Sequence, residues 1–211
     1  MSKKSSKQNK SWLSRQNNDV YVKKSRAEGY RSRASYKLLE INEKDHIFKQ
    51  DMIVVDLGST PGGWSQVAKK LVGSKGKVIA LDILEMEPLA GVTFIHGDFT
   101  SEETLNRLLA HLSESNIAKV DLVISDMAPN LTGIKTSDQA NSIYLIQLAF
   151  QFAQLALKPG GTLLVKAFQG SKFDMLVKEM RTSFSKLLIR KPNASRSESK
   201  EVYLLATGYN L

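Results

Sequence analysis

The chain of 211 residues contains no cysteine, and this absence excludes several chemistries at once. Without cysteine there is no disulfide framework, no thiolate-ligated zinc or iron–sulfur cluster and no thiolate nucleophile. The three histidines, at positions 46, 96 and 111, lack the spacing of a zinc site, so we expect no metal. No apolar run approaches the length of a transmembrane helix, and the basic start MSKKSSKQNKSW lacks the apolar stretch of a signal peptide. We therefore expect a cytoplasmic protein that does not contact a membrane.

The positive charge is confined to the beginning of the chain. Residues 1–37 hold 11 basic and two acidic residues, whereas residues 38–211 hold 19 of each, so the whole net charge of +9 lies in the first segment. Such a segment indicates a polyanion as the binding partner. Trp12 and Tyr21, which lie among the charges, indicate that this polyanion is nucleic acid, because aromatic rings stack on bases. A solubilising tail and a mitochondrial presequence are the alternatives. We predict a flexible basic arm over residues 1–25 and one domain over residues 26–211.

Short apolar runs alternate with helical periodicity along the rest of the chain, which predicts βαβ units and a parallel sheet. The predicted strands are 52–57, 78–82, 92–96, 120–125, 161–168, 184–190 and 201–207. The predicted helices are 33–44, 64–72, 101–112, 138–157 and 173–181. Asp138 is predicted to cap the fourth of these helices, and Pro159-Gly160-Gly161 to break it.

Carboxylates end or closely follow four of the predicted strands: Asp56, Asp82, Asp98 and Asp126. Ligands of open parallel sheets bind beyond the carboxyl ends of the strands, so these side chains are candidates for a ligand site. Asp82 is placed to accept hydrogen bonds from ribose hydroxyls, although it could also be a helix cap or a surface charge.

The first turn after a strand reads D-L-G-S-T-P-G-G-W, from Asp56 to Trp64. Its glycines would let the backbone approach a ligand without a Cβ clash, although the alternative is simply a tight turn. The turn does not match G-x-G-x-x-G, and Pro61 removes a backbone donor from what would be a pyrophosphate cradle. Both features argue against a dinucleotide.

Taken together, the motifs from about residue 26 onward resemble the FtsJ/RrmJ family of S-adenosylmethionine-dependent RNA 2′-O-methyltransferases, and most of all its bacterial members that act on large-subunit ribosomal RNA. Besides D-L-G-S-T-P-G-G-W, the matching motifs are S-R-A-S-Y-K-L at 32–38, L-D at 81–82, G-D-F at 97–99, S-D-M-A-P-N at 125–130, L-V-K-A-F-Q-G at 164–170, R-K-P at 190–192, S-R at 195–196 and E-V-Y-L-L-A-T-G at 201–208. One departure is Ser59-Thr60, where the family more often has two alanines.

The resemblance implies a single α/β, Rossmann-like methyltransferase domain with a mostly parallel seven-stranded sheet, an antiparallel last strand and helices on both faces. It implies methyl transfer from S-adenosyl-L-methionine to the 2′-hydroxyl of a uridine ribose in 23S ribosomal RNA, within the assembled large subunit. We expect a monomer without an obligate protein partner. A messenger RNA cap methyltransferase, an RNA-binding assembly factor and, least favoured, an NAD oxidoreductase are the alternatives.

The family's catalytic tetrad falls on Lys37, Asp126, Lys166 and Glu201. Lys166 is unusual on its own account, because it interrupts the apolar strand GTLLVKAF, and the alternative is a lysine that extends to solvent from a strand end. The implied cofactor-binding residues are Gly58, Gly62, Gly63, Trp64, Asp82, Asp98 and Asp126. The candidate RNA-binding residues are Lys23, Lys24, Arg26, Arg31, Arg33, Arg190, Lys191 and Arg196, any of which could instead be a solvated charge.

Overall fold

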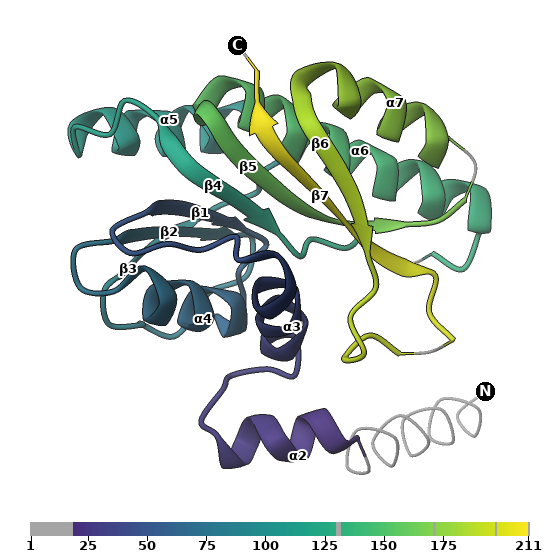
Figure 1. The fold of residues 1–211 in the computed structure, drawn as a ribbon, viewed down its shortest axis with the longest axis horizontal. Helices are drawn as coiled ribbons and strands as arrows, with labels where there is room; N and C mark the ends of the chain where they lie inside the picture. The colour runs from purple at the N-terminus through teal and green to yellow at the C-terminus, as the bar shows by residue number, and fades with distance from the viewer. Residues whose placement is uncertain (1–18, 130–131, 171, 197, 211) are drawn as a thin grey trace.

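The central sheet of the computed structural model has the predicted topology. The structure describes residues 19–129, 132–170, 172–196 and 198–210. The strands are β1 (Ile53–Leu57), β2 (Lys77–Asp82), β3 (Val92–His96), β4 (Val120–Ser125), β5 (Leu157–Phe168), β6 (Phe184–Arg190) and β7 (Glu201–Tyr209). They lie side by side in the order β3-β2-β1-β4-β5-β7-β6 (Figure 1). Neighbouring strands are parallel except that β7 runs antiparallel to both β5 and β6. The predicted fold class, including the antiparallel last strand, is confirmed.

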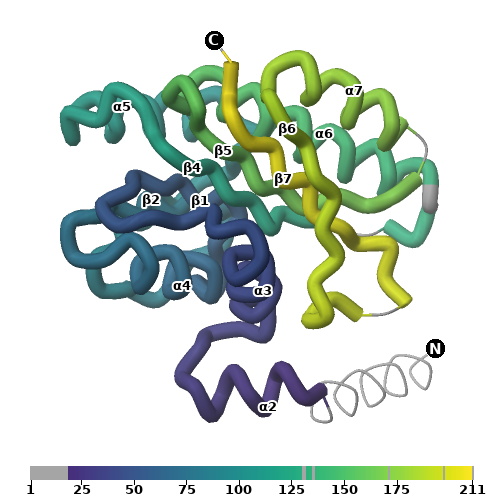
Figure 2. The backbone as a smooth tube through the Cα atoms, viewed as in Figure 1, coloured from purple at the N-terminus to yellow at the C-terminus, as the bar shows by residue number. Residues whose placement is uncertain are grey.

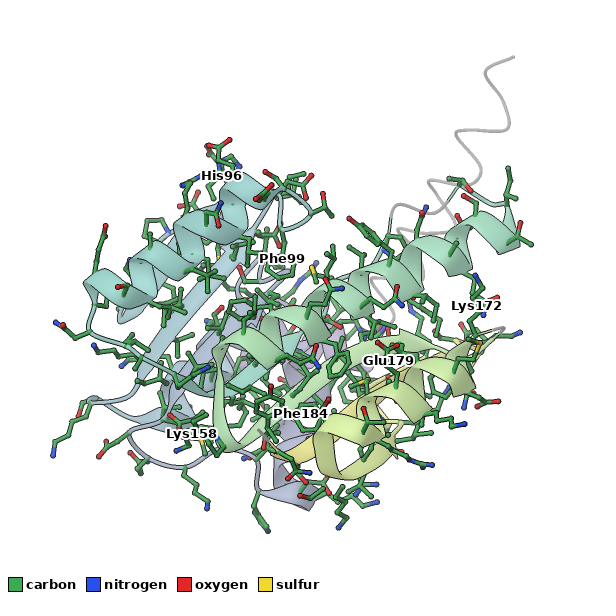
Figure 3. The ribbon with its side chains drawn as sticks, turned by 90° about the horizontal axis from the view of Figure 1, so that it is seen from above. His96, Phe99, Lys158, Lys172, Glu179 and Phe184 are labelled. Carbon is green, nitrogen blue, oxygen red and sulfur yellow. The ribbon has the colours of Figure 1, made fainter. Side chains whose placement is uncertain are left out.

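Helices cover both faces of this sheet. The described helices are α2 (Val20–Ala27), α3 (Ser35–Asp45), α4 (Gly63–Val72), α5 (Glu102–Glu114), α6 (Lys135–Ala156) and α7 (Phe173–Ser183). One face packs against α3 and α4, and the other packs against α5, α6 and α7, which lie across it in Figure 3. In the part of the chain that the structure describes, no helix is both long and apolar enough to cross a bilayer.

Continuous burial explains why the central strands read as unbroken apolar runs in the sequence. Val54, Val55 and Leu57 of β1 are fully buried, because alternate side chains enter the two hydrophobic cores on opposite faces. The same alternation holds in β7, where Tyr203 belongs to the core under α3 and α4, and Leu204 belongs to the core under α5 to α7.

The long helix α6 differs from our expectation at both ends. It begins at Lys135, three residues before Asp138. The carboxylate of Asp138 accepts hydrogen bonds from Thr132 and from the amide of Gly133, so it fastens the preceding loop instead of capping the helix. At the other end the helix stops at Ala156, before the Pro-Gly-Gly sequence, because Leu157 already pairs with Val120 as the first residue of β5. Sheet pairing therefore ends the helix earlier than the sequence predicts.

The second difference concerns the N-terminal arm, which we expected to be flexible to residue 25. Residues 20–27 form α2, whose N-cap Asp19 accepts hydrogen bonds from the amides of Tyr21 and Val22. The helix is attached to the domain, because the Tyr21 hydroxyl donates to Glu40 and the Tyr21 ring lies 5.5 Å from the Tyr36 ring. Figure 2 shows α2 beyond α3, at the edge of the molecule. Residues 1–18, the rest of the predicted arm, lie outside the described residues.

Candidate active site

Four separate elements bring the tetrad residues to the carboxyl edge of the sheet. Ser125, the last residue of β4, pairs with Val165 of β5, so Asp126 and Lys166 follow at the same level. Because β7 is antiparallel, its first residue Glu201 pairs with Phe168 at the end of β5 and reaches the same edge. Lys37 is supplied by α3. The sequence-predicted tetrad therefore converges on one place.

The tetrad consists of two ion pairs. The Lys37 ammonium lies 2.7 Å from Glu201 Oε1, and the Lys166 ammonium lies 3.1 Å from Asp126 Oδ1. Lys166 also donates a hydrogen bond to the backbone carbonyl of Asp126, and only 8% of its side chain is exposed. Taking such groups out of water is costly, and a buried ion pair is weak evidence for a gain in stability. The arrangement is better explained by chemistry than by folding.

Tyr203, which the sequence motifs did not single out, lies between the two ion pairs. It pairs with Lys166 across β5 and β7, and its side chain is fully buried. Its hydroxyl is 2.8 Å from Asp126 Oδ1 and 3.3 Å from Glu201 Oε1. The signal was present in the sequence, because a residue two positions after Glu201 on a strand lies on the same face.

The electrostatics of this cluster keep the tyrosine protonated and the glutamate charged. Burial, followed by the nearby charges of Asp126 and Glu201, raises the pKa of Tyr203 well above its usual range. Burial alone would raise the pKa of Glu201, but Lys37 and the hydrogen bond from Ser195 Oγ outweigh it and hold that pKa below its ordinary value. Glu201 is thus an acceptor, and Tyr203 is a donor, around neutral pH.

A cavity of about 440 Å³ opens beside the tetrad at the same edge of the sheet. Four sequence-predicted cofactor residues line it: Gly58, Asp82, Asp98 and Asp126. Its walls also include the exposed apolar side chains of Ile83 and Leu84 and the ring of Phe99. A cavity with carboxylate acceptors and apolar walls suits a ligand that carries hydroxyl or amino groups and a flat ring.

The carboxylates in the cavity are held in place by backbone amides. Asp82 accepts hydrogen bonds at 2.8 Å from the amides of Thr60 and Leu84, and Asp98 accepts one at 2.9 Å from Thr100. A carboxylate has about four lone-pair positions, so each retains capacity for a ligand. Within the described ranges, no three histidine, aspartate or glutamate side chains gather as a metal site would require.

Gly62, Gly63 and Trp64 do not line this cavity, although we expected all three at the cofactor. They are buried, and they pack against the segment before α3. A Cβ on Gly63 would lie 2.3 Å from Ser32 Oγ, and Gly62 has a φ of +106°, which favours glycine. The Trp64 indole donates to the carbonyl of Ala34 at 2.8 Å. In this structure the three residues shape the turn from within the protein.

Asp56 also lies outside the cavity, and its side chain is completely buried under α4. Its Oδ2 accepts a hydrogen bond from Ser65 at 2.6 Å, whereas its Oδ1 has no hydrogen-bond partner among the described residues. Burial raises the pKa of Asp56 to about 7, against the opposing effect of the Ser65 hydrogen bond. The first carboxylate of the motif is therefore a buried group whose charge changes near neutral pH.

Several candidate RNA-binding residues are engaged by the protein itself. The guanidinium of Arg31 donates to the carbonyls of Pro61, Glu87 and Pro88. Arg33 pairs with Asp19 at 2.9 Å, and Arg190 makes two hydrogen bonds to Asp45, which lower the pKa of that carboxyl. Lys24 pairs with Glu28, and Lys191 donates to the carbonyl of Ser199. The remaining candidates are exposed: Lys23, Arg26 and Arg196.

Comparison with known proteins finds a matching family, relatives that cover nearly the whole chain and a similar solved structure. The sequence pattern of the FtsJ-like methyltransferase family matches residues 30–209. The "Ribosomal RNA large subunit methyltransferase E" of Marinobacter nauticus is 54% identical over 206 residues, which cover 98% of each chain. The protein of the same name from Legionella pneumophila is 53% identical over 205 residues, covering 97% of this chain and 98% of that one. A Plasmodium falciparum structure described as a ribosomal RNA methyltransferase has a TM-score of 0.77 at 32% identity, covering 85% of this chain and 98% of that one.

Proposed function

Because the chain belongs to the FtsJ-like methyltransferase family, we propose that it methylates the 2′-hydroxyl of a uridine ribose in 23S ribosomal RNA of the large subunit. The observation that carries this proposal is the pair of buried ion pairs, Lys37 with Glu201 and Lys166 with Asp126, beside a cavity lined by Asp82 and Asp98. The names of its full-length relatives support the choice of ribosomal RNA as substrate.

The cavity residues fit S-adenosyl-L-methionine as the methyl donor. Asp82 would accept hydrogen bonds from the ribose hydroxyls, and Asp98 would accept one from the adenine amino group, while Gly58, which lines the cavity, would border the ligand. Gly62, Gly63 and Trp64 would act on the same site by fixing the turn that carries it. When bound, the cofactor supplies a methyl group on a positively charged sulfur.

The tetrad residues would prepare the attacking hydroxyl. A hydroxyl is a weak nucleophile, so its positioning in line with the methyl group supplies much of the rate. Lys166 would orient the 2′-hydroxyl or, once it has released its own proton to solvent, would take the proton of that hydroxyl as the new carbon–oxygen bond forms and the carbon–sulfur bond breaks. Lys37 would orient the ribose from the side of α3. Asp126 and Glu201 hold the two amino groups at 3.1 and 2.7 Å, and Asp126 also borders the cavity.

For RNA binding, we propose that residues 1–25 continue the basic surface and that residues 26–211 carry the chemistry. Lys23 and Arg26 are exposed on α2, and Arg196 is exposed before the start of β7. Lys191 is exposed as well, although its amino group donates to the carbonyl of Ser199. Lys24, Arg31, Arg33 and Arg190 would contribute by fixing the segments that border the tetrad, since their charged groups already bind protein oxygens. We further propose a cytoplasmic monomer that needs no protein partner, which light scattering in solution would test.

The decisive experiment is methyl transfer from radiolabelled S-adenosylmethionine to large ribosomal subunits that lack the modification, beside free ribosomal RNA. We expect label on a uridine 2′-oxygen of the subunit RNA with the wild-type protein and none with Lys166→Ala. Label on a base, or on a messenger RNA cap, would overturn the proposed acceptor. No label on any substrate with the cofactor still bound would favour an assembly factor without catalysis.

A further inference from the structure

The hydroxyl of Tyr203 carries one proton but faces two carboxylates. It lies 2.8 Å from Asp126 Oδ1 and 3.3 Å from Glu201 Oε1, and Tyr203 itself is fully buried. A phenol can donate only one hydrogen bond, and an ionised carboxylate cannot donate in return. The shorter distance gives the proton to Asp126, while the oxygen stays in contact with Glu201.

Both contacts are made on the oxygens that hold the lysines. Asp126 Oδ1 is also the carboxylate oxygen that pairs with the Lys166 ammonium, at 3.1 Å, and Glu201 Oε1 is also the one that pairs with the Lys37 ammonium, at 2.7 Å. The tyrosine hydroxyl is therefore the atom that joins two otherwise separate ion pairs. Movement of either carboxylate would shift the hydroxyl, and with it the contact that the hydroxyl makes to the other carboxylate.

The ring of Tyr203 cannot easily move away from this position. It lies 5.6 Å from the ring of Trp64, and the Lys37 ammonium lies 5.7 Å above it. On β7 it is paired with Lys166 of β5, so its backbone is fixed by the sheet. A rigid ring with its hydroxyl between two charged groups can hold their geometry to within a small tolerance.

We propose that Tyr203 is a positioning residue that couples the two ion pairs of the tetrad. Its hydroxyl holds Asp126 in the orientation that aims Lys166 at the reacting hydroxyl, and it keeps Glu201 and Lys37 in register with them. This inference rests on the proposed methyl transfer. It assigns to Tyr203 no contact with substrate or cofactor.

The matched control is Tyr209 on the same strand. Tyr209 is also buried, but its hydroxyl donates at 2.9 Å to the backbone carbonyl of Gln154, on the other face of the sheet. Tyr203→Phe and Tyr209→Phe each remove one hydroxyl and keep the ring. If Tyr203 only filled space or satisfied a buried polar atom, the two substitutions would have the same effect on catalysis.

We would measure kcat, KM for each substrate and the thermal unfolding midpoint of the wild type, Tyr203→Phe and Tyr209→Phe. Crystal structures of the wild type and of Tyr203→Phe would be compared. We expect kcat of Tyr203→Phe to fall about 10-fold or more with both KM values within about 2-fold, because the loss affects positioning rather than binding. Tyr209→Phe should keep kcat within about 2-fold. In the Tyr203→Phe crystal the Lys166–Asp126 pair should be displaced.

A kcat of Tyr203→Phe equal to that of Tyr209→Phe would overturn the inference, and so would a crystal in which Asp126 and Glu201 keep their positions. If the wild-type protein transferred no methyl group to any RNA, the proposed function would fail. The crystal comparison would then decide the inference by itself, since displacement of the carboxylates does not depend on activity.

Discussion

The charges at the carboxyl edge of the sheet and the charges near α2 differ in how far the sequence anticipated their partners. At the carboxyl edge, Lys37 and Lys166 each meet one carboxylate in a largely buried ion pair. Near α2, basic residues close in sequence have different environments. Arg26 is exposed, whereas the guanidinium of Arg31 donates hydrogen bonds to three backbone carbonyls. A cluster of positive charge in a sequence is therefore not the same as a positively charged surface.

The two regions also differ in what their charges contribute. A largely buried lysine–carboxylate pair is costly to desolvate, so it is weak evidence for a gain in stability. An arginine that donates to backbone carbonyls fixes two loops to each other, and it does so with the planar donor fork that lysine lacks. Substitutions in each region test whether the charges of the two regions have these different roles.

The largest effect is expected for Lys166→Ala. Removal of the group that handles the proton should lower the single-turnover rate of methyl transfer about 10³-fold or more, while the cofactor Kd stays within about 3-fold. Quench-flow kinetics and calorimetric titration with S-adenosylmethionine measure the two quantities. A folded variant that had lost the cofactor but retained the rate at saturating cofactor would contradict the assigned role.

The next largest effect concerns Asp56 and pH. Its folded pKa of about 7 lies above the ordinary value of 3.8, so the folded state binds more protons than the unfolded state between those values. The stability that comes from this group is present below about pH 4 and is lost as the pH rises through 7, which amounts to about 4 kcal/mol. Urea unfolding from pH 4 to 8 should show this loss in the wild type but not in Asp56→Asn.

Asp138 provides a control of opposite sign for that titration. Hydrogen bonds from Thr132 and Gly133 lower the pKa of Asp138, so its contribution to stability is present above the unfolded value and is lost as the pH falls. Asp138→Asn should therefore differ from the wild type in slope only on the acid side. Equal slopes in Asp56→Asn and the wild type would show that Asp56 is charged in the folded protein.

A smaller effect is expected for Asp82→Ala, which removes a carboxylate from the cavity. Loss of hydrogen bonds to a charged group costs about 1.5–3 kcal/mol, so the cofactor Kd should rise roughly 10- to 150-fold. The control is Asp121→Ala, because Asp121 also accepts a backbone hydrogen bond, from Ile53, but lies at the opposite end of the sheet. An equal rise in both variants would mean that general loosening of the fold, rather than ligand contact, is responsible.

The smallest effects compare two arginines of the basic segment. Arg31→Lys should lower the free energy of unfolding by about 1–3 kcal/mol, because lysine cannot reach three carbonyls at once, and should leave the salt dependence of RNA binding unchanged. Arg26→Gln should leave stability unchanged and reduce the slope of log K against log salt by roughly 0.7–0.9. Urea unfolding measures the stability of both variants, and filter binding at several salt concentrations measures the salt slope. A reduced salt slope for Arg31→Lys together with a loss of stability for Arg26→Gln would contradict the roles assigned to the two arginines.

The sequence predicted the sheet well because the sheet depends on local patterns, whereas the tetrad positions came from the family resemblance, and only Lys166 stood out on its own account. Buried parallel strands appear as apolar runs, and a lysine inside such a run is conspicuous. The partners of Arg31 and the packing of Gly63 against Ser32 depend on contacts between distant segments, which no periodicity encodes. The start of β5 was predicted at residue 161 instead of Leu157 for the same reason, since the pairing of Leu157 with Val120 carries the strand through the Pro-Gly-Gly sequence. Tyr203 was missed because an aromatic residue in a buried strand is ordinarily part of the core.

The strand β7 follows β5 and β6 in the chain but lies between them in the sheet. During synthesis, β5 and β6 are therefore made before β7, the strand that pairs with both of them. Until β7 is in place, each has an unpaired edge to which another strand could add. Glu201 and Tyr203 belong to β7. A chain without β7 thus has neither a continuous seven-stranded sheet nor a complete tetrad, because the same strand supplies both the missing neighbour and Glu201.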